Sequence, residues 1–479
     1  MNSLLLIGLF LSASPRCVEV LALSDLHGHL EALPQVAARV GALRERGPVL
    51  LLDAGDSLQG TLEADRTRGA AVVEAYGAMG VAAAAVGNHD FDHGAAALRD
   101  RMREAPYPFL AANLAERATG GLPAWQGLAA RRLVKLPGGL AVGLLGLSAR
   151  ETAYTTMPRN VEGLAFSDPL PAAAREAAAL RAEGASLVVA LAHVGGTCRE
   201  RRGGAPCPAA GELRRLADGL PAGAVDALVG GHTHELVAER VGAVGVVQPG
   251  KHGEHLGWIT LCEGRPPEVH APVALRPGEP FLGKVREPPG ALVALVERRR
   301  QAVRREGEEP VGAVLPRRLT RSRTGPSPLG AAAAQGLRAA AGADFGLVNA
   351  GSLRADLPAG PLLQGRLHEA LPFDDRVAVL TVSGTELTRL IGQVQRKGFP
   401  QVAGLLLGAE GPRTCAGEPL APDGRYRVAT GEFLATGGDQ RRKGLRLGQV
   451  ELLPGRTMRD AVADWLRSAP PGRLAAQCP

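Results

Sequence analysis

The feature that most constrains this chain is a pattern that recurs five times in its N-terminal half: a short apolar run followed by a cluster of His, Asp or Asn. Each run is continuous and bounded by Gly, which predicts a buried strand. The runs with their clusters span residues 18–29, 49–60, 81–92, 187–196 and 225–234. Stretches rich in Ala and Arg lie between them at helical spacing, over 31–46, 63–79, 94–104 and 168–183. Strands that alternate with helices predict a layered α/β fold, in which the carboxyl ends of several strands meet at one crevice.

The length of the chain predicts two domains, because 479 residues are too many for one compact core. A Pro-rich stretch over 277–289 ends the first region, and a helix-like segment over 291–306 follows it. The charge run of that segment is typical of a solvated helix face. We therefore predict a first domain over 17–285, a linker helix and hinge over 286–310, and a smaller second α/β domain over 311–479.

The formal charge of +7 comes from basic residues that are spread along the chain rather than gathered in blocks. This distribution favours a small anionic substrate and argues against a nucleic-acid polymer as the partner. After the first residues, no segment is long and apolar enough to span a bilayer. The sequence leaves the oligomeric state open.

The first residues predict export. An apolar stretch ending in small residues is too short for a membrane span, so we expect residues 1–16 to be a signal peptide. Because no Lys or Arg precedes the stretch, a buried first strand is the alternative. Six cysteines, an even number, fit an oxidising compartment, either periplasmic or extracellular. Cys198 and Cys207 lie close together and are the first expected disulfide, whereas Cys262 in a predicted strand could be a buried thiol.

The polar clusters contribute two carboxylates, one amide and four imidazoles. These candidate metal ligands are Asp25, His27, Asp56, Asn88, His193, His232 and His234. A lone Asp-x-His or His-x-His pair is common on protein surfaces, but five pieces in order at strand ends predict one binuclear site. Nitrogen and oxygen ligands of this kind suit two divalent ions of Zn, Mn, Fe or Co, and a single Asp can bridge them.

The order of these clusters resembles the calcineurin-like metallophosphoesterases. The segments Gly-Asp-Ser-Leu-Gln-Gly and Gly-Asn-His-Asp-Phe-Asp resemble the 5′-nucleotidase / UDP-sugar hydrolase branch, and the resemblance extends over about 18–450. It implies a four-layer α/β/β/α domain followed by a 5′-nucleotidase C-terminal substrate-binding domain. It also implies two ligand sets that share Asp56 as the bridge: Asp25, His27, Asp56 and His234 for one metal, and Asp56, Asn88, His193 and His232 for the other.

Such a pair of cations, about 3.5–4 Å apart, clamps a phosphate oxygen and activates a water for in-line attack on phosphorus. His89, if protonated, can stabilise the developing charge or protonate the leaving group, and Asp92 can hold that imidazole charged and oriented. This dyad also resembles the family's. The alternative for Asp92 is a helix N-cap. The loop 248–257 resembles a family loop that closes on the site, so His252 is a candidate for the phosphate region, and the role of Gln59 stays open.

The second domain resembles the family's substrate domain in three motifs, which carry Asn349, Gly351 and Arg354, then Phe373, then Phe433 and Asp439. The two Phe are candidates to stack on a base, although Phe residues are more often core residues. Asp439 is a candidate for the ribose hydroxyls. Arg323 and Arg354 are candidates for phosphate oxygens.

Several positions depart from the family pattern. Pro326 and Ala331 replace an acidic residue and an Asn. Asp374-Asp375 replaces Gly-Asn after Phe373, and Gln440-Arg441 replaces Gly-Tyr after Asp439. These changes surround the base and phosphate pockets and leave the metal chemistry untouched.

The resemblance implies hydrolysis of nucleoside 5′-monophosphates, and longer phosphate chains or nucleotide sugars fit the same chemistry. A 2′,3′-cyclic-nucleotide 2′-phosphodiesterase/3′-nucleotidase is the alternative. A thiosulfohydrolase-like enzyme is disfavoured by the paired Phe motifs, and a non-catalytic nucleotide-binding protein is disfavoured by the complete ligand set.

Overall fold

The computed structural model describes residues 16–197, 210–438 and 450–478. The predicted signal peptide falls almost entirely outside the described residues. The predicted Cys198–Cys207 disulfide and the candidate ribose ligand Asp439 lie outside them as well.

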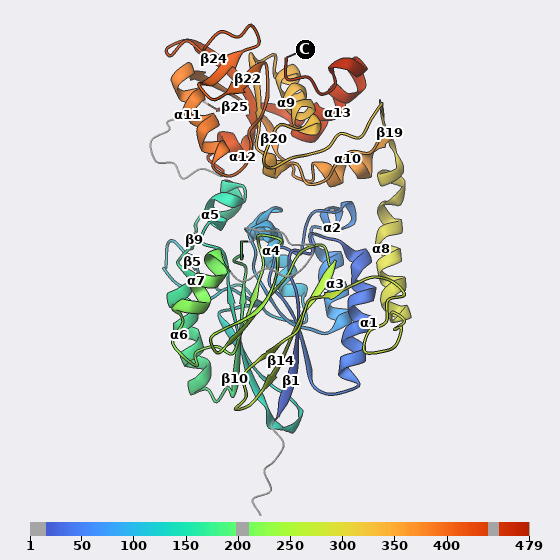
Figure 1. The fold of residues 1–479 in the computed structure, drawn as a ribbon, viewed down its shortest axis with the longest axis vertical. Helices are drawn as coiled ribbons and strands as arrows, with labels where there is room; N and C mark the ends of the chain where they lie inside the picture. The colour runs from blue at the N-terminus through green and yellow to red at the C-terminus, as the bar shows by residue number, and fades with distance from the viewer. Residues whose placement is uncertain (1–15, 198–209, 439–449, 479) are drawn as a thin grey trace, which may run out of the picture.

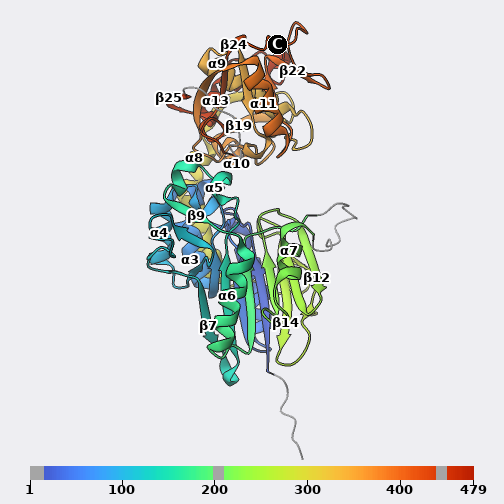
Figure 2. The same ribbon diagram turned by 90° about the vertical axis from the view of Figure 1, so that its left-hand side faces the viewer.

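Two mixed sheets form the N-terminal region (Figures 1 and 2). The first sheet has the order β15-β14-β1-β2-β3-β4-β6, with β16 paired to β14; its strands are β1 (Cys17–Leu23), β2 (Val49–Asp53), β3 (Val81–Ala85), β4 (Phe109–Leu110), β6 (Leu128–Ala129), β14 (His255–Cys262), β15 (Glu268–Val269) and β16 (Val273–Ala274). The second has the order β12-β13-β11-β10-β8-β7; its strands are β7 (Arg131–Lys135), β8 (Ala141–Leu147), β10 (Leu187–Ala192), β11 (Ala227–Gly230), β12 (Leu236–Val241) and β13 (Val244–Pro249). A separate pair joins β5 (Leu114–Glu116) to β9 (Leu164–Phe166).

Helices cover the outer faces of both sheets. The helices of this region are α1 (Leu33–Arg44), α2 (Leu62–Arg66), α3 (Ala70–Met79), α4 (Ala95–Glu104), α5 (Thr152–Thr155), α6 (Pro169–Ala182) and α7 (Gly211–Gly219). Successive side chains of a strand point to opposite faces. In β1, Leu21 and Leu23 pack with α1, α3 and α4, whereas Val20 and Ala22 pack between the sheets. Helices α6 and α7 cover the second sheet. The expected α/β/β/α layering is therefore confirmed.

All five predicted strands are present, and the predicted helical stretches are helical with one difference. The stretch over 63–79 is two helices, α2 and α3, separated at Arg68 and Gly69, which both have positive φ. A Cβ on Gly69 would lie 2.8 Å from the Cβ of Leu58, so close packing on the neighbouring loop forces the break.

The C-terminal region is a second α/β unit (Figure 1). Its main sheet has the order β21-β18-β24-β20-β25; the strands are β18 (Phe345–Val348), β20 (Arg376–Ser383), β21 (Gln401–Ala403), β24 (Arg425–Gly431) and β25 (Val450–Thr457). Two smaller pairs join β17 (Pro310–Leu315) to β19 (Gly360–Leu363), and β22 (Leu405–Gly408) to β23 (Gly411–Thr414). The helices are α9 (Pro328–Ala341), α10 (Gln364–Ala370), α11 (Gly384–Gln395), α12 (Glu432–Ala435) and α13 (Met458–Ser468). Helices α9 and α13 cover one face of the main sheet, and α11 covers the other.

The predicted linker is largely one helix, α8 (Gly290–Glu308), which runs along the N-terminal region and leads into β17 (Figure 1). Its apolar side chains Leu292, Leu295 and Val296 are buried in the core of the N-terminal region. Its charged face carries Arg299, which donates to Glu74 at 2.7 Å. The charge run is thus a helix surface, as predicted.

Two disulfides are present among the described residues. Cys17 pairs with Cys262, and this disulfide joins facing positions of β1 and β14. Cys415 pairs with Cys478. The interpretation of Cys262 as a reduced buried thiol is therefore wrong. In the described part of the chain, no helix combines the length and the apolar character that crossing a bilayer demands.

Candidate functional site

Tight turns at the strand ends aim the predicted metal ligands. Eight non-Gly residues of the described chain have positive φ, and five of them are predicted ligands: Asp25, His27, Asp56, His232 and His234. A left-handed conformation costs about 1–2 kcal/mol for such a residue, so strain of this kind concentrates where the surroundings hold it in place. The strained residues coincide with the predicted ligands, which indicates that these loops are shaped for a functional site.

The first group of candidate ligands lies at the ends of β1 and β11. One ligand atom from each of Asp25, His27 and His234 lies within 4.8 Å of the others. The Nε2 atoms of His27 and His234 are 3.1 Å apart, and Nε2 of His234 is 3.4 Å from Oδ1 of Asp25. Behind His27, the Nε2 of Gln59 lies 3.2 Å from the other ring nitrogen, Nδ1. The amide N–H of Gln59 can only donate to this nitrogen, whereas a metal-binding imidazole usually donates from its second nitrogen, so the role of Gln59 stays open.

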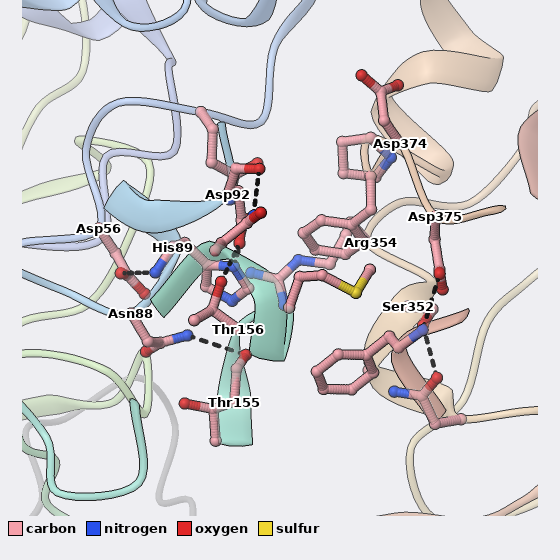
Figure 3. A pocket seen from close by; sticks show the side chains of 18 of the residues that line it. Asp56, Asn88, His89, Asp92, Thr155, Thr156, Ser352, Arg354, Asp374 and Asp375 are labelled. Atoms are coloured by element: carbon pink, nitrogen blue, oxygen red, sulfur yellow. Dashed lines mark hydrogen bonds and ion pairs between the residues drawn. The ribbon is translucent and has the colours of Figure 1, made fainter. Parts of the chain in front are cut away.

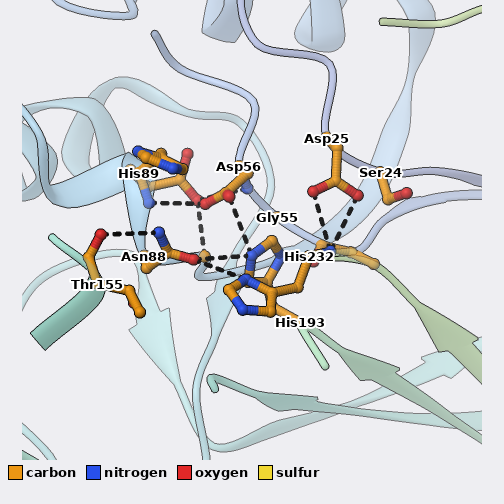
Figure 4. Close-up of polar contacts among 12 residues, drawn as sticks. Ser24, Asp25, Gly55, Asp56, Asn88, His89, Thr155, His193 and His232 are labelled. Carbon is orange, nitrogen blue, oxygen red and sulfur yellow. Dashed lines mark hydrogen bonds and ion pairs between the residues drawn. The ribbon is translucent and has the colours of Figure 1, made fainter. Parts of the chain in front are cut away.

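The second group comes from the ends of β2, β10 and β11, and comprises Asp56, His193 and His232 (Figure 4). Nε2 of His193 is 3.1 Å from Oδ2 of Asp56. The amide oxygen of Asn88 faces both imidazoles, at 3.3 Å from His193 Nε2 and 2.9 Å from His232 Nδ1. Nδ1 of His193 lies 2.8 Å from the carbonyl oxygen of Ala54. The structure thus brings all seven predicted ligands together in two adjoining groups.

The charges of the two groups fit divalent cations. Burial lowers the pKa of His27, and the neighbouring Arg354 lowers it further. Burial also lowers the pKa of His232 and His234, so these imidazoles are neutral and available as ligands. Burial raises the pKa of Asp56, but the nearby imidazoles, His193 first, outweigh it and hold the carboxylate ionised. Burial lowers the pKa of His193, but Asp56 outweighs it and raises that pKa to about 10, so a cation that binds here would displace the proton of His193. Imidazole nitrogens and carboxylate and amide oxygens are the donors that Zn, Mn, Fe or Co accept.

His89 and Asp92 form the predicted dyad beside the second group (Figure 3). Nδ1 of His89 lies 2.7 Å from Oδ2 of Asp92, and the other carboxylate oxygen accepts from the hydroxyl of Thr156 at 2.9 Å. Burial lowers the pKa of His89, but Asp92 and Asp56 outweigh it and raise the pKa above its ordinary value. The alternative of an N-cap is wrong for Asp92, because Gly94 occupies the N-cap of α4.

A cavity of about 570 Å³ opens from this site between the N-terminal and C-terminal regions. Its size is in the range of small-molecule sites. Six of the seven predicted substrate residues line it: Arg323, Asn349, Gly351, Arg354, Phe373 and Phe433. The seventh, Asp439, is outside the described residues.

Arg354 is the substrate-domain residue that reaches farthest toward the metal groups. Its Nη2 lies 3.2 Å from Nε2 of His27, and its guanidinium lies 5.8 Å from the ring centre of Phe373. The Phe373 ring in turn stacks on His89, with 5.4 Å between ring centres and 20° between planes. Phe373 therefore contacts the dyad in this structure, and its role in base stacking stays a prediction.

Charged contacts join the two regions around the cavity. Nε2 of His368 in α10 lies 2.6 Å from Oδ2 of Asp65 in α2, whose other oxygen is 3.2 Å from Nε2 of His93. Arg159 of the N-terminal region pairs with Glu432 of α12, which also accepts from Arg376. Sequence reasoning missed these contacts, because nothing in the local pattern pairs side chains so distant in sequence.

His252 and His29 lie at the edge of the site. Their rings stack at 4.0 Å, and His29 also contacts Glu31. His252 is 5.9 Å from His27 between ring centres, and its backbone N–H donates to the carbonyl oxygen of Asp25. His252 thus supports the loop of the first group, and its contact with phosphate stays a prediction.

Sequence reasoning also missed Asp90, which lies between His89 and the dyad carboxylate in the sequence. It is 4% exposed and accepts four backbone N–H groups, from Asp56, Ser57, Leu58 and Gly87. The sequence does show an acidic residue at this place in the Gly-Asn-His-Asp segment, but a role is predicted from the sequence only for the nearby Asp92.

Comparison with known proteins identifies both regions. Residues 18–236 match the model of the calcineurin-like phosphoesterases, and residues 308–443 match that of the 5′-nucleotidase C-terminal domain.

Relatives align over most of the chain. Protein UshA of Salmonella pullorum is 26% identical over 484 residues, which cover 88% of this chain and 86% of UshA. The trifunctional nucleotide phosphoesterase YfkN of Bacillus subtilis is also 26% identical and covers 88% of this chain, but the chain spans only 32% of YfkN. The crystal structure of a 5′-nucleotidase precursor from Thermus thermophilus superposes with a TM-score of 0.76 at 23% identity, covering 94% of this chain and 96% of that one.

Proposed function

Because this chain belongs to the calcineurin-like phosphoesterases that carry a 5′-nucleotidase C-terminal domain, we propose that it hydrolyses nucleoside 5′-phosphates to nucleosides and phosphate with the help of two divalent metal ions. One observation carries the proposal. Two adjoining groups of buried His and Asp open into a cavity whose other wall presents Arg and Phe side chains.

The two metal ions would be held by the groups described above. Asp25, His27 and His234 would hold one ion, Asn88, His193 and His232 would hold the other, and Asp56 is the proposed shared ligand. When bound, the two ions supply Lewis-acid stabilisation of phosphate oxygens and an activated water. Both loops that carry Asp56 and Asn88 are buried, so these ligands are preorganised.

His89 is the proposed proton donor to the leaving oxygen. Asp92 and Thr156 fix the orientation of its ring, and the carboxylate favours its protonated form. A proton delivered to the departing ribose oxygen neutralises the charge that develops there as the P–O bond breaks.

The C-terminal region would hold the rest of the nucleotide. Arg354 and Arg323 place cationic groups where the phosphate would meet the metal groups, and an Arg fork suits phosphate oxygens. Asn349 and Gly351 lie on the same loop as Arg354 and would fit against the phosphate or the sugar. Phe433 on α12 offers a flat face for a base, and Asp439, outside the described residues, would take the ribose hydroxyls.

We further propose the domain limits 17–285 and 311–479, with 286–310 as the hinge. Since the cavity is lined by both regions, substrate exchange would require them to separate. We also propose that the protein works in an oxidising compartment outside the cytoplasm, after removal of residues 1–16. The two disulfides of the described chain support this location.

A substrate panel tests the proposed activity. The purified protein is assayed with Mn²⁺ or Zn²⁺ on AMP, ADP, UDP-glucose, 2′,3′-cyclic AMP and a small phosphate ester without a base. We expect the highest kcat/KM with AMP and loss of all activity in a chelator. A preference for 2′,3′-cyclic AMP would favour the cyclic phosphodiesterase instead, and full activity in chelator would contradict the metal mechanism.

A further inference from the structure

The loop that carries the proposed bridging ligand Asp56 has a strained backbone. Asp56 has a left-handed backbone, with φ of 59°, and the preceding Gly55 has φ of 94°. The loop over 54–60 lacks regular secondary structure, and its backbone N–H groups are buried away from water. A buried N–H without a partner costs about 1–3 kcal/mol, so these groups need an acceptor.

A single carboxylate, that of Asp90, provides the acceptor for three of these N–H groups. Oδ1 of Asp90 accepts from the N–H groups of Ser57 at 3.0 Å and Leu58 at 3.2 Å. Oδ2 accepts from the N–H groups of Asp56 at 3.1 Å and Gly87 at 2.8 Å. All four lone-pair positions of the carboxylate are therefore used, which no other side chain of this size can do.

The same contacts tie together the two loops that hold the second metal group. Asp90 lies on the loop after β3, beside Asn88, and its carboxylate grips the loop after β2. In return, Oδ1 of Asp56 accepts from the N–H of His89 at 2.7 Å (Figure 4). A Cβ on Gly87 would lie 2.1 Å from Oδ1 of Asp56, which shows how closely the two loops approach. The two loops hold each other, because the carboxylate of each loop accepts hydrogen bonds from backbone N–H groups of the other.

We infer that Asp90 is a positioning residue for the metal pair: its carboxylate fixes the strained loop of Asp56 against the loop of Asn88, and thereby sets the affinity for the metal ions. Asp90 belongs to neither candidate metal group and is not a lining residue of the cavity. This inference rests on the proposed metal pair but not on the proposed substrate. Partners behind metal ligands typically contribute about 10- to 100-fold to metal affinity.

The test is Asp90→Asn. The amide keeps one oxygen but turns an NH₂ group toward two of the four backbone N–H groups, so those two bonds become donor–donor contacts. Asp226→Asn is the matched control. Oδ2 of Asp226 accepts the backbone N–H of Val188 at 2.7 Å and an N–H of Arg181 at 2.6 Å, so this change also removes charge from a structural carboxylate, and Asp226 is not a lining residue of the cavity.

Metal-free protein is titrated with Zn²⁺ by calorimetry, and the melting temperature is measured without metal. We expect Asp90→Asn to raise the dissociation constant of the weaker site about 10-fold or more, and Asp226→Asn to leave it within about twofold at a similar loss of melting temperature. High Zn²⁺ should restore turnover of Asp90→Asn. If Asp90→Asn does not fold, Asp90→Glu keeps the charge but displaces the acceptors, and should weaken binding in the same direction.

Two outcomes would overturn the inference. One is wild-type Zn²⁺ affinity in every folded Asp90 variant, and the other is an equal loss of affinity in Asp226→Asn. The proposed function fails separately, if the wild-type protein itself binds no Zn²⁺ or Mn²⁺, or binds metal but hydrolyses none of the nucleotides.

Discussion

The role of Asp92 can be isolated by the substitution Asp92→Asn. Asn keeps the shape of the side chain: its oxygen can accept from His89 while its NH₂ group donates to the hydroxyl oxygen of Thr156, but the negative charge beside His89 is lost. The contact between Asp92 and His89 is 2.7 Å, and both side chains are only 15% exposed, so solvent screens it little. A charge-assisted hydrogen bond contributes about 1.5–3 kcal/mol, and a neutral one about 0.5–1.5 kcal/mol.

The difference of about 1–2 kcal/mol is the support that a protonated His89 would lose. At about 1.4 kcal/mol for each factor of ten, we expect kcat for AMP to fall about 5- to 30-fold. The metal content should stay at two ions per chain, which is measured by elemental analysis of the dialysed protein.

A second substrate sharpens the test. Because a proton donor matters less when the leaving group is already stable as an anion, p-nitrophenyl phosphate should lose much less turnover than AMP. Equal losses on the two substrates would refute proton donation by His89. A kcat for AMP within twofold of the wild type would refute the support by Asp92.

Two further perturbations probe the C-terminal region. Phe433→Ala should raise KM for AMP about 5- to 150-fold, since stacking contributes about 1–3 kcal/mol per base. KM for a phosphate ester without a base should stay unchanged, and an equal rise of KM for both substrates would exclude stacking. Burial raises the pKa of Asp375 to about 7, above the ordinary value of about 3.9. The folded protein thus holds this proton more tightly than the unfolded chain does. The contribution of this proton to the free energy of unfolding is complete below about pH 4 and is lost as the pH rises through about 7. Asp375→Asn should therefore gain about 2 kcal/mol more over the wild type at pH 8 than at pH 5, measured by urea unfolding; equal differences would show that Asp375 ionises normally.

The strand ends were predictable because their signal is local. A short apolar run is typical of a buried strand. The polar residues that follow parallel strands lie at the same edge of the sheet. Asp25, His27, Asn88 and His193 all follow such runs directly, so the pattern predicted one shared site, whereas its division into two ligand sets came from the family resemblance.

The features that sequence reasoning missed depend on contacts between distant segments. The break before α3 follows from the packing of Gly69 on Leu58, which helical spacing does not encode. Cys17 finds Cys262 across 245 residues because β14 returns antiparallel beside β1. The sequence does not distinguish Asp90 from the nearby Asp92, because the four backbone N–H groups that donate to Asp90 are visible only in the structure.

The contacts across the cavity have a consequence for the hinge motion proposed above. They are mostly charged or polar, as with His368 on Asp65, Arg159 on Glu432 and Arg354 beside His27. The carboxylates of the two ion pairs are at most 8% exposed, and salt screens buried pairs little. Removing one partner, rather than changing the ionic strength, should therefore be the perturbation that most readily shifts the population between the apposed and the parted arrangement.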